Sequence, residues 1–207
     1  MSRELSFLLR HGAKNAGLPI RPDGYDNVDV LLRHRSLRGL DFATLESIVS
    51  RDQKSRYNLF NEGGTVENCS WWIRANQGYS IADIILDLKR ITSATEIPMN
   101  SQIPMAVHGT SMVAWRMISD RGLSRMSRNH IHLAQSFVGD VIRMRSSSKV
   151  LIFIDVARAL DADIQFYLSS NGVVLTPGND SGYLEHRFFS RVERVQNNGK
   201  PIPGWKG

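Results

Sequence analysis

The sequence predicts an α+β fold in two parts, and three observations carry that prediction. Residues 1–93 hold three short helical patterns and then a pair of strand-like runs, an order typical of a winged helix-turn-helix. Residues 94–106 lack periodicity and contain two prolines, which indicates a linker. Residues 107–195 contain many short apolar runs and few helical patterns, which favours a compact sheet core. Residues 196–207 are expected to form a poorly ordered tail.

A first helix is expected over residues 2–15, because its apolar side chains share one face. Ser2 can cap the N-terminus of this helix, and Gly17 can end it. The apolar side chains on the shared face are Leu5, Leu8 and Leu9. We therefore expect this face to pack into the core of the first part.

Two shorter helices and a hairpin are expected to follow. Asp26 comes after a Pro-Asp-Gly-Tyr turn and is expected to open the second helix, and Asp41 is expected to cap the third. The runs 56–60 and 69–75 flank a glycine-rich turn and are predicted to be the two strands of a β-hairpin. The same order of elements also occurs in protein–protein modules, so the layout alone leaves the partner open.

The second part is predicted to alternate a few helices with short strands. One strand is expected to end at His108, and Thr110 or Ser111 is expected to cap the helix after it. Further strands are expected at 131–133, 150–156, 164–168 and 173–176. Many short strands in this order predict a sheet core rather than a helical bundle.

Charge and composition narrow the class of protein. The net charge is +6, and 20 of the 26 basic residues are arginines, whose planar fork matches phosphate oxygens. The excess of basic over acidic residues is concentrated between Arg116 and Lys149. This concentration fits a polyanionic partner and a solvated basic face equally well. The single cysteine, Cys69, excludes an internal disulfide and a Cys-rich zinc site. With no membrane-length apolar run and no apolar N-terminal leader, an intracellular, metal-free protein is expected.

Three arginines stand out as candidates for binding phosphate. Arg10 is followed by His11, so a bidentate fork lies beside a group that titrates near neutral pH, although basic residues also suit the end of a helix. Arg56 at the start of the predicted hairpin fits a surface charge on an edge strand equally well. Arg128 lies in SRNHIHL, among polar residues that a core strand would not choose, so a binding role is favoured there.

A His-Gly-Thr turn is the second kind of candidate. His108 fits either a buried core position or a ligand site, and Gly109 would let a ligand approach the backbone closely. The spacing of His130 and His132 does not complete a zinc site. The chain also lacks a P-loop. A polar, phosphate-bearing ligand held by backbone and side chains is therefore expected here.

Taken together, these motifs resemble those of the NAD-dependent RNA 2′-phosphotransferases. The resemblance rests on LSFLLRHGA, DGY, the Arg of DQKSRY, IRANQGYS, HGT, GLSRMSRNHIHL, MRSSS, IFIDV and NGVVLTPGN, in this order. It covers residues from about 5 to about 180. One departure is the Tyr79 of QGYS, where the family usually has a histidine.

The resemblance implies a fold and a site. In this family a winged-helix N-terminal lobe joins a C-terminal ADP-ribosyltransferase-like lobe, and the active site lies between them. The implied catalytic quartet is Arg10, His11, Arg56 and Arg128. The implied NAD-binding residues are His108, Gly109, Thr110, Ser127, Asn129 and His132. No metal is implied.

The resemblance also implies a reaction and its partners. An internal 2′-phosphate of RNA, as left at a tRNA splice junction, would pass to NAD, giving 2′-hydroxyl RNA, nicotinamide and ADP-ribose 1″,2″-cyclic phosphate. Arginine forks can position the phosphate and stabilise charge on its oxygens without a metal. A monomer is expected. Two alternatives stay open: an ADP-ribosyltransferase that caps nucleic-acid phosphate ends, and a non-catalytic winged-helix module.

Overall fold

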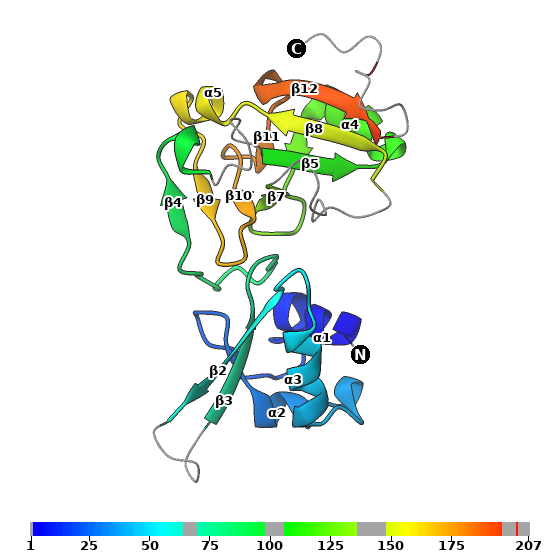
Figure 1. Cartoon of the computed structure of the whole chain (residues 1–207), viewed down its shortest axis with the longest axis vertical. Coiled ribbons are helices and arrows are strands. Elements are labelled where there is room, and N and C mark those ends of the chain that lie inside the picture. The colour runs from blue at the N-terminus through cyan, green and yellow to red at the C-terminus, as the bar shows by residue number, and fades with distance from the viewer. Residues whose placement is uncertain (1, 64–69, 98–105, 136–147, 196–201, 203–207) are drawn as a thin grey trace. The chain divides into compact units, whose positions relative to one another are not determined.

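The computed structural model contains both helices and strands, which confirms the α+β class (Figure 1). It describes residues 2–63, 70–97, 106–135, 148–195 and 202. The chain divides into two compact units, residues 1–87 and 88–207. The division falls earlier than the expected boundary at residue 93, because strand β4 (Lys89–Ile91) pairs with a strand of the second unit.

The first unit packs short helices against one small antiparallel sheet, whose strand order is β1–β3–β2. Its elements are α1 Ser2–Phe7, the π-helical turn η1 Leu8–Gly12, β1 Asp26–Asn27, α2 Val28–Leu32, η2 Arg35–Leu37, α3 Phe42–Ser50, β2 Tyr57–Glu62 and β3 Ser70–Ala75. The expected hairpin is present as β2 and β3, which pair from Tyr57 opposite Ala75 to Glu62 opposite Ser70. Asp41 caps α3 as predicted, accepting a hydrogen bond from the N–H of Thr44.

The first helix differs from its prediction in its second half. Leu5, Leu8 and Leu9 are buried, as the apolar spacing predicted. However, the α-helical hydrogen bonding ends at Phe7, and residues 8–12 form a π-helical turn. Such turns are rare and often occur at functional sites. The apolar pattern could not reveal this change, because the leucine face stays buried in either form.

The expectation that Asp26 opens the second helix is wrong. Asp26 lies in β1 opposite Ile73, and its side chain is fully buried. Asn27 caps α2 instead, with its side chain accepting from the N–H of Val30. Asp and Asn are both good capping residues, so composition did not separate the two neighbours. Burial raises the pKa of the Asp26 carboxyl to about 6, and the backbone N–H of Asn27 lowers it only in part.

Asp26→Asn is expected to stabilise the protein at pH 7. The folded state raises the pKa of Asp26 above the ordinary 3.8, so it binds the proton more tightly than the unfolded state. Stability from this group is therefore present at low pH and is lost as the pH rises from about 4 to about 6, by about 3 kcal/mol. Urea unfolding at pH 4.5 and pH 7 measures about two thirds of this loss, because the rest has already occurred by pH 4.5. An equal pH dependence in the wild type and in Asp26→Asn would contradict the assignment.

The second unit is built from three small sheets. Their strand orders are β4–β9–β10–β7, β12–β8–β5 and β11–β6, and every pairing is antiparallel. The elements after β4 are η3 Ala94–Glu96, β5 Ala106–Thr110, α4 Met112–Arg121, β6 Leu123–Ser124, β7 Ile131–Leu133, β8 Val150–Ile154, α5 Val156–Asp161, β9 Phe166–Leu168, β10 Val174–Thr176, β11 Tyr183–Leu184, η4 His186–Phe188 and β12 Phe189–Arg194. Ser111, the second of the two expected caps, caps α4 by accepting from the N–H of Ala114.

Part of the predicted tail belongs to the core of the second unit. Ile202 is buried in that core, and its N–H donates to the carbonyl of Val192 over 3.2 Å. An apolar residue between two prolines can thus pack even where no helix or strand is predicted. Cys69 and most of the expected linker lie outside the described residues. Within the described residues, no helix is long and apolar enough to cross a membrane.

Candidate functional site

Arg10 and His11 lie in the π-helical turn η1 and contact a segment that follows strand β3, residues 76–80. The Nδ1 atom of His11 lies 2.9 Å from the hydroxyl of Ser80, and the carbonyl of Arg10 accepts from the N–H of Ser80 over 3.0 Å. A Cβ added to Gly78, whose φ is +92°, would lie 3.4 Å from the Arg10 side chain. The segment therefore holds the backbone of Arg10 and fixes the ring of His11.

Arg56 is joined to the same segment from the other side. Its carbonyl accepts from the N–H of Asn76 over 2.8 Å, and the amide of Asn76 donates to the carbonyl of Ser55 over 2.7 Å. The guanidinium of Arg56 forms an ion pair with Asp52, whose side chain is 6% exposed. The first unit thus brings together Arg10, His11 and Arg56 around residues 76–80. Asp52 is a member of this site that sequence reasoning missed.

Tyr79 anchors this segment through its buried side chain. Its side chain is 3% exposed, and its hydroxyl accepts from the N–H of Ala75 over 3.0 Å. The same hydroxyl faces two carbonyl acceptors, that of Ala75 at 2.9 Å and that of Gly24 at 3.2 Å. A Cβ at Gly24 would lie 2.6 Å from this oxygen, so a glycine is needed there. Burial raises the pKa of Tyr79, which keeps the hydroxyl protonated.

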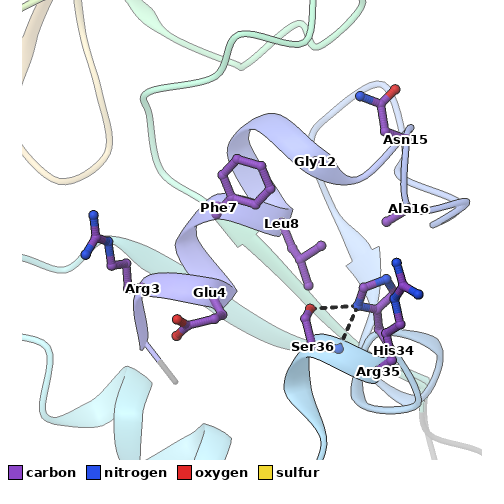
Figure 2. Close-up of a pocket in the computed structure, with 10 residues that line it drawn as sticks. All are labelled: Arg3, Glu4, Phe7, Leu8, Gly12, Asn15, Ala16, His34, Arg35 and Ser36. Atoms are coloured by element: carbon purple, nitrogen blue, oxygen red, sulfur yellow. Dashed lines mark hydrogen bonds between the residues drawn. The ribbon is translucent and has the colours of Figure 1, made fainter.

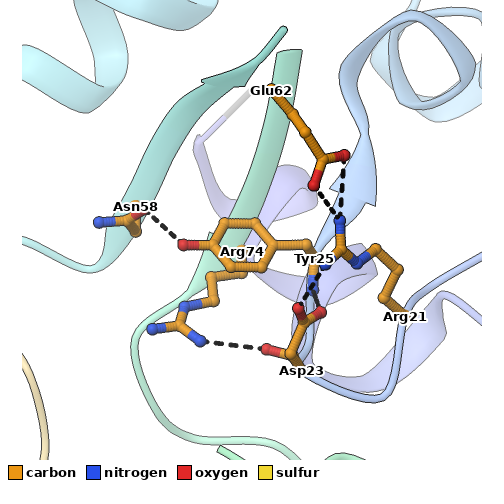
Figure 3. A network of polar contacts seen from close by, with 6 residues as sticks. All are labelled: Arg21, Asp23, Tyr25, Asn58, Glu62 and Arg74. Atoms are coloured by element: carbon orange, nitrogen blue, oxygen red, sulfur yellow. Dashed lines mark hydrogen bonds and ion pairs between the residues drawn. The ribbon is translucent and has the colours of Figure 1, made fainter. Parts of the chain in front are cut away.

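A polar network holds the Pro-Asp-Gly-Tyr turn in place (Figure 3). Arg74 donates to the carbonyl of Asp23 over 3.2 Å, and Arg21 forms ion pairs with both Asp23 and Glu62. The guanidinium of Arg74 also lies 4.7 Å from the centre of the Tyr25 ring. The turn is therefore fixed on one side by these arginines and on the other by the Tyr79 hydroxyl.

Tyr79→Phe is expected to lower the free energy of unfolding by about 1–3 kcal/mol, because it leaves the buried N–H of Ala75 without this acceptor. Urea denaturation measures the loss. Tyr25→Phe is a matched control, because its hydroxyl bonds the exposed Asn58 side chain and water can replace that contact. Equal free energies of unfolding for the wild type and Tyr79→Phe would contradict a stabilising role for the buried hydroxyl.

The second unit contains a pocket of about 660 Å³ that collects most of the other candidates. Five of the predicted residues line it: His108, Thr110, Ser127, Arg128 and His132. The expected His-Gly-Thr turn is wrong, because His108, Gly109 and Thr110 all belong to strand β5 and pair with β8. The Nδ1 atom of His108 lies 3.1 Å from the carbonyl of His132, which joins β5 to strand β7. Gly109 and Asn129 belong to the same two segments but do not line the pocket.

The loop that carries Arg128 is held by Arg125. The guanidinium of Arg125 donates to the carbonyl of Arg128 over 2.8 Å, and the N–H of Arg125 donates to the carbonyl of Gly182 over 3.0 Å. A Cβ at Gly182 would lie 2.6 Å from the Arg125 side chain, so the two segments approach closely. Sequence reasoning placed Arg125 only in a basic stretch. Its spacing of three residues from Arg128 in a polar loop was the signal that could have found it.

His130 is a further pocket residue, considered from the sequence only as a possible zinc ligand. Burial lowers its pKa, and the charge of Arg125 lowers it further, so the ring is neutral at pH 7. Its ring centre lies 6.0 Å from that of Tyr167 at an interplanar angle of 70°. A neutral imidazole can donate one hydrogen bond and accept another without adding charge to the pocket.

The structure therefore places the predicted quartet as three residues in the first unit and Arg128 in the second. That Arg128 acts together with the other three stays a prediction. Among the described residues, no group of three or more His, Cys, Asp or Glu side chains could hold a metal ion.

Comparison with known proteins gives consistent matches. The family model described as RNA 2′-phosphotransferase, Tpt1 / KptA family, matches residues 1–178. The chain is 38% identical over 206 residues to a Danio rerio protein named tRNA 2′-phosphotransferase 1, covering 98% of this chain and 87% of that protein. The protein of the same name from Homo sapiens is 36% identical over 98% of this chain and 78% of its own length. A Schizosaccharomyces pombe protein is 43% identical over 93% of this chain, which spans half the length of that relative.

Proposed function

Because the chain belongs to the RNA 2′-phosphotransferase, Tpt1 / KptA family, we propose that it removes an internal 2′-phosphate from spliced tRNA and transfers it to NAD. The products would be RNA with a 2′-hydroxyl, nicotinamide and ADP-ribose 1″,2″-cyclic phosphate. The names of the Danio rerio and Homo sapiens relatives support tRNA as the substrate. The observation that carries the proposal is the gathering of Arg10, His11 and Arg56 around residues 76–80.

The second-unit pocket supports NAD as the co-substrate. Its volume of about 660 Å³ lies within the range of small-molecule sites, and its lining offers hydroxyl, imidazole and guanidinium donors suited to a pyrophosphate. We assign NAD binding to His108, Thr110, Ser127 and His132. When bound, NAD supplies an electrophilic ribose carbon with nicotinamide as its leaving group, together with a ribose hydroxyl.

The quartet supplies positioning and charge. Arg10, Arg56 and Arg128 bind the oxygens of the RNA 2′-phosphate and stabilise the negative charge that develops on them, as arginine does in other phosphoryl transfers. His11, oriented by Ser80, adds a fourth donor and can hold a proton near neutral pH. Asp52 holds Arg56 in place through its ion pair. None of these roles requires the side chains to form a covalent bond.

The two units would divide this work. We propose that the first unit is a winged-helix RNA-binding lobe, which is supported by its three helices and its β2–β3 hairpin. We propose that the second unit is an ADP-ribosyltransferase-like lobe, which is supported by its three small antiparallel sheets and its polar pocket. Both lobes are needed if the quartet acts on one phosphate.

Incubation of the protein with NAD and an oligoribonucleotide carrying one internal 2′-phosphate tests the proposal. We expect free nicotinamide and 2′-hydroxyl RNA in equal amounts, with the phosphate recovered as the cyclic product. The control is the same oligonucleotide without the 2′-phosphate, which should release no nicotinamide. ADP-ribosylated RNA as the end product would instead indicate a capping ADP-ribosyltransferase. Binding of RNA with no nicotinamide released would indicate a non-catalytic module.

A further inference from the structure

The first unit has a groove of about 560 Å³ that the reaction described above does not use (Figure 2). Helix α1 and the turn η1 form one wall of the groove, and residues 34–36 form the other. Figure 2 shows Arg3 near one end, Arg35 at the other and the ring of Phe7 on the side of Gly12. Glu4 is the acidic member of the lining. The groove thus offers two guanidinium groups and one aromatic ring.

The arginines of the groove differ from those of the network in Figure 3. Arg21 in that network is neutralised by Asp23 and Glu62, so its charge is used to hold the turn. Within the described part of the chain, neither Arg3 nor Arg35 forms an ion pair, and both side chains are exposed. Hydrogen bonding lowers the pKa of the Glu4 carboxyl in the same groove, and the charge of Arg3 contributes to this shift. Exposed guanidinium groups outside ion pairs match a partner that carries phosphates.

Two further arginines extend this positive charge. Arg33 and Arg38 are exposed and flank Arg35 closely in sequence, and residues 33–38 contain no acidic side chain. His34 also lines the groove, where its Nδ1 atom bonds Ser36 over 2.8 Å. A run of this composition is typical of nucleic-acid contacts. The wall formed by residues 34–36 is therefore complementary to an RNA backbone.

Phe7 connects the groove to the proposed catalytic residues. Its side chain is 59% exposed, which is unusual for phenylalanine in a soluble domain. Its ring centre lies 5.9 Å from that of His11 at an interplanar angle of 49°. Phe7 therefore lies both in the lining of the groove and beside His11. An exposed aromatic ring can stack on a base of single-stranded nucleic acid whatever its sequence.

We propose that this groove binds the RNA nucleotides next to the 2′-phosphate, with one base on Phe7 and backbone phosphates on Arg3 and Arg35. This inference rests on the proposed function, because it places the 2′-phosphate itself at His11. It names the part of the substrate that the groove recognises, which is a single strand that continues from the modified nucleotide. The paired acceptor stem of a tRNA would not present an unstacked base to Phe7.

A length series of 2′-phosphorylated oligoribonucleotides tests the groove. In the wild type we expect KM to fall as nucleotides are added beside the modified one, with kcat nearly constant. In Arg3→Gln/Arg35→Gln that fall should be largely lost, while the shortest substrate is turned over as in the wild type. Arg51→Gln/Arg158→Gln is the matched control, because both arginines are exposed, form no ion pair within the described residues, and change the net charge equally.

Salt dependence gives a second readout of the same contacts. Binding of a single-stranded 2′-phosphorylated oligonucleotide weakens as salt rises, and each lost phosphate contact reduces the magnitude of the negative slope of log K against log salt by about 0.7. Arg3→Gln/Arg35→Gln should therefore reduce this magnitude by about 1.4, and the control pair should leave it unchanged. An unchanged slope and an unchanged length series would overturn the proposal, and the groove would then serve another partner.

Phe7 is tested by two variants of similar volume. Phe7→Leu should raise KM for the longer oligonucleotides by roughly 5- to 150-fold, the range for loss of one stacked base. Phe7→Tyr should restore the wild-type KM, because its ring can still stack. Equal KM values for Phe7→Leu and wild type would contradict the stacking role. If the wild type does not turn over 2′-phosphorylated RNA, the proposed function is contradicted. If the wild type turns over this RNA but KM does not depend on the length of the oligonucleotide, only the proposed role of the groove is contradicted.

Discussion

Arg128→Ala is expected to lower turnover of a 2′-phosphorylated RNA by at least about 10²- to 10³-fold while the protein stays folded. One arginine that stabilises charge on a transferring phosphate contributes roughly 3–4 kcal/mol, which sets this minimum. Arg128 lies in a polar loop and lines the pocket, so its loss removes no core packing. Formation of 2′-hydroxyl RNA under single-turnover conditions measures the effect directly.

Two further variants sharpen this prediction. Arg128→Lys should recover little activity, because an ammonium group cannot reproduce the bidentate fork. Arg158 is an exposed arginine on α5 of the same unit. Arg158→Ala is the control for losing one positive charge and should keep normal turnover. Near-normal turnover by Arg128→Ala would remove this residue from the quartet.

Gly122→Ala is expected to destabilise the second unit by about 3 kcal/mol or more. Gly122 ends helix α4 with φ +85° and ψ 179°, a region of backbone space that is essentially limited to glycine. A Cβ there would lie 2.5 Å from the carbonyl oxygen of Leu184, which is backbone and cannot rotate away. The strain and the clash each cost about 1–3 kcal/mol. Thermal or urea unfolding measures the sum.

Gly39→Ala provides the matched control for this substitution. Gly39 has nearly the same φ, +86°, but a Cβ there meets no atom within 4 Å. It should therefore cost only the backbone strain, about 1 kcal/mol. If both variants lower the free energy of unfolding by the same amount, the close approach of Gly122 to strand β11 does not add to the cost of the substitution. Because Gly122 also lines the pocket, its variant should lose NAD-dependent turnover as well.

The helices and strands that the sequence predicted well are those whose faces are apolar. Leu5, Leu8 and Leu9 are buried as their spacing required, and residues 131–133 form the expected strand β7. The β2–β3 hairpin also follows its prediction. In each case one face meets a core, so a periodic pattern of apolar residues is enough to identify the element.

The parts that could not be predicted depend on contacts between distant segments. The anchoring of Arg10 and Arg56 by residues 76–80 uses backbone hydrogen bonds, which any sequence can make. The hold of Arg125 on the Arg128 loop is likewise a bond to a carbonyl. The burial of Asp26 follows from the pairing of β1 with β3, which no local pattern specifies. Motif resemblance implied a role for the four basic residues, but it did not describe how the chain holds them.

Because Arg10, His11 and Arg56 are all held by residues 76–80, these three residues are expected to shift together. Any change that displaces the stretch from Asn76 to Ser80, including a one-residue insertion, would move all of them at once. When a substitution in this stretch is combined with Arg10→Ala, the loss of transition-state stabilisation, in kcal/mol, should consequently be smaller than the sum of the losses for the two single variants. A change in this stretch is therefore expected to alter three of the four proposed catalytic residues together.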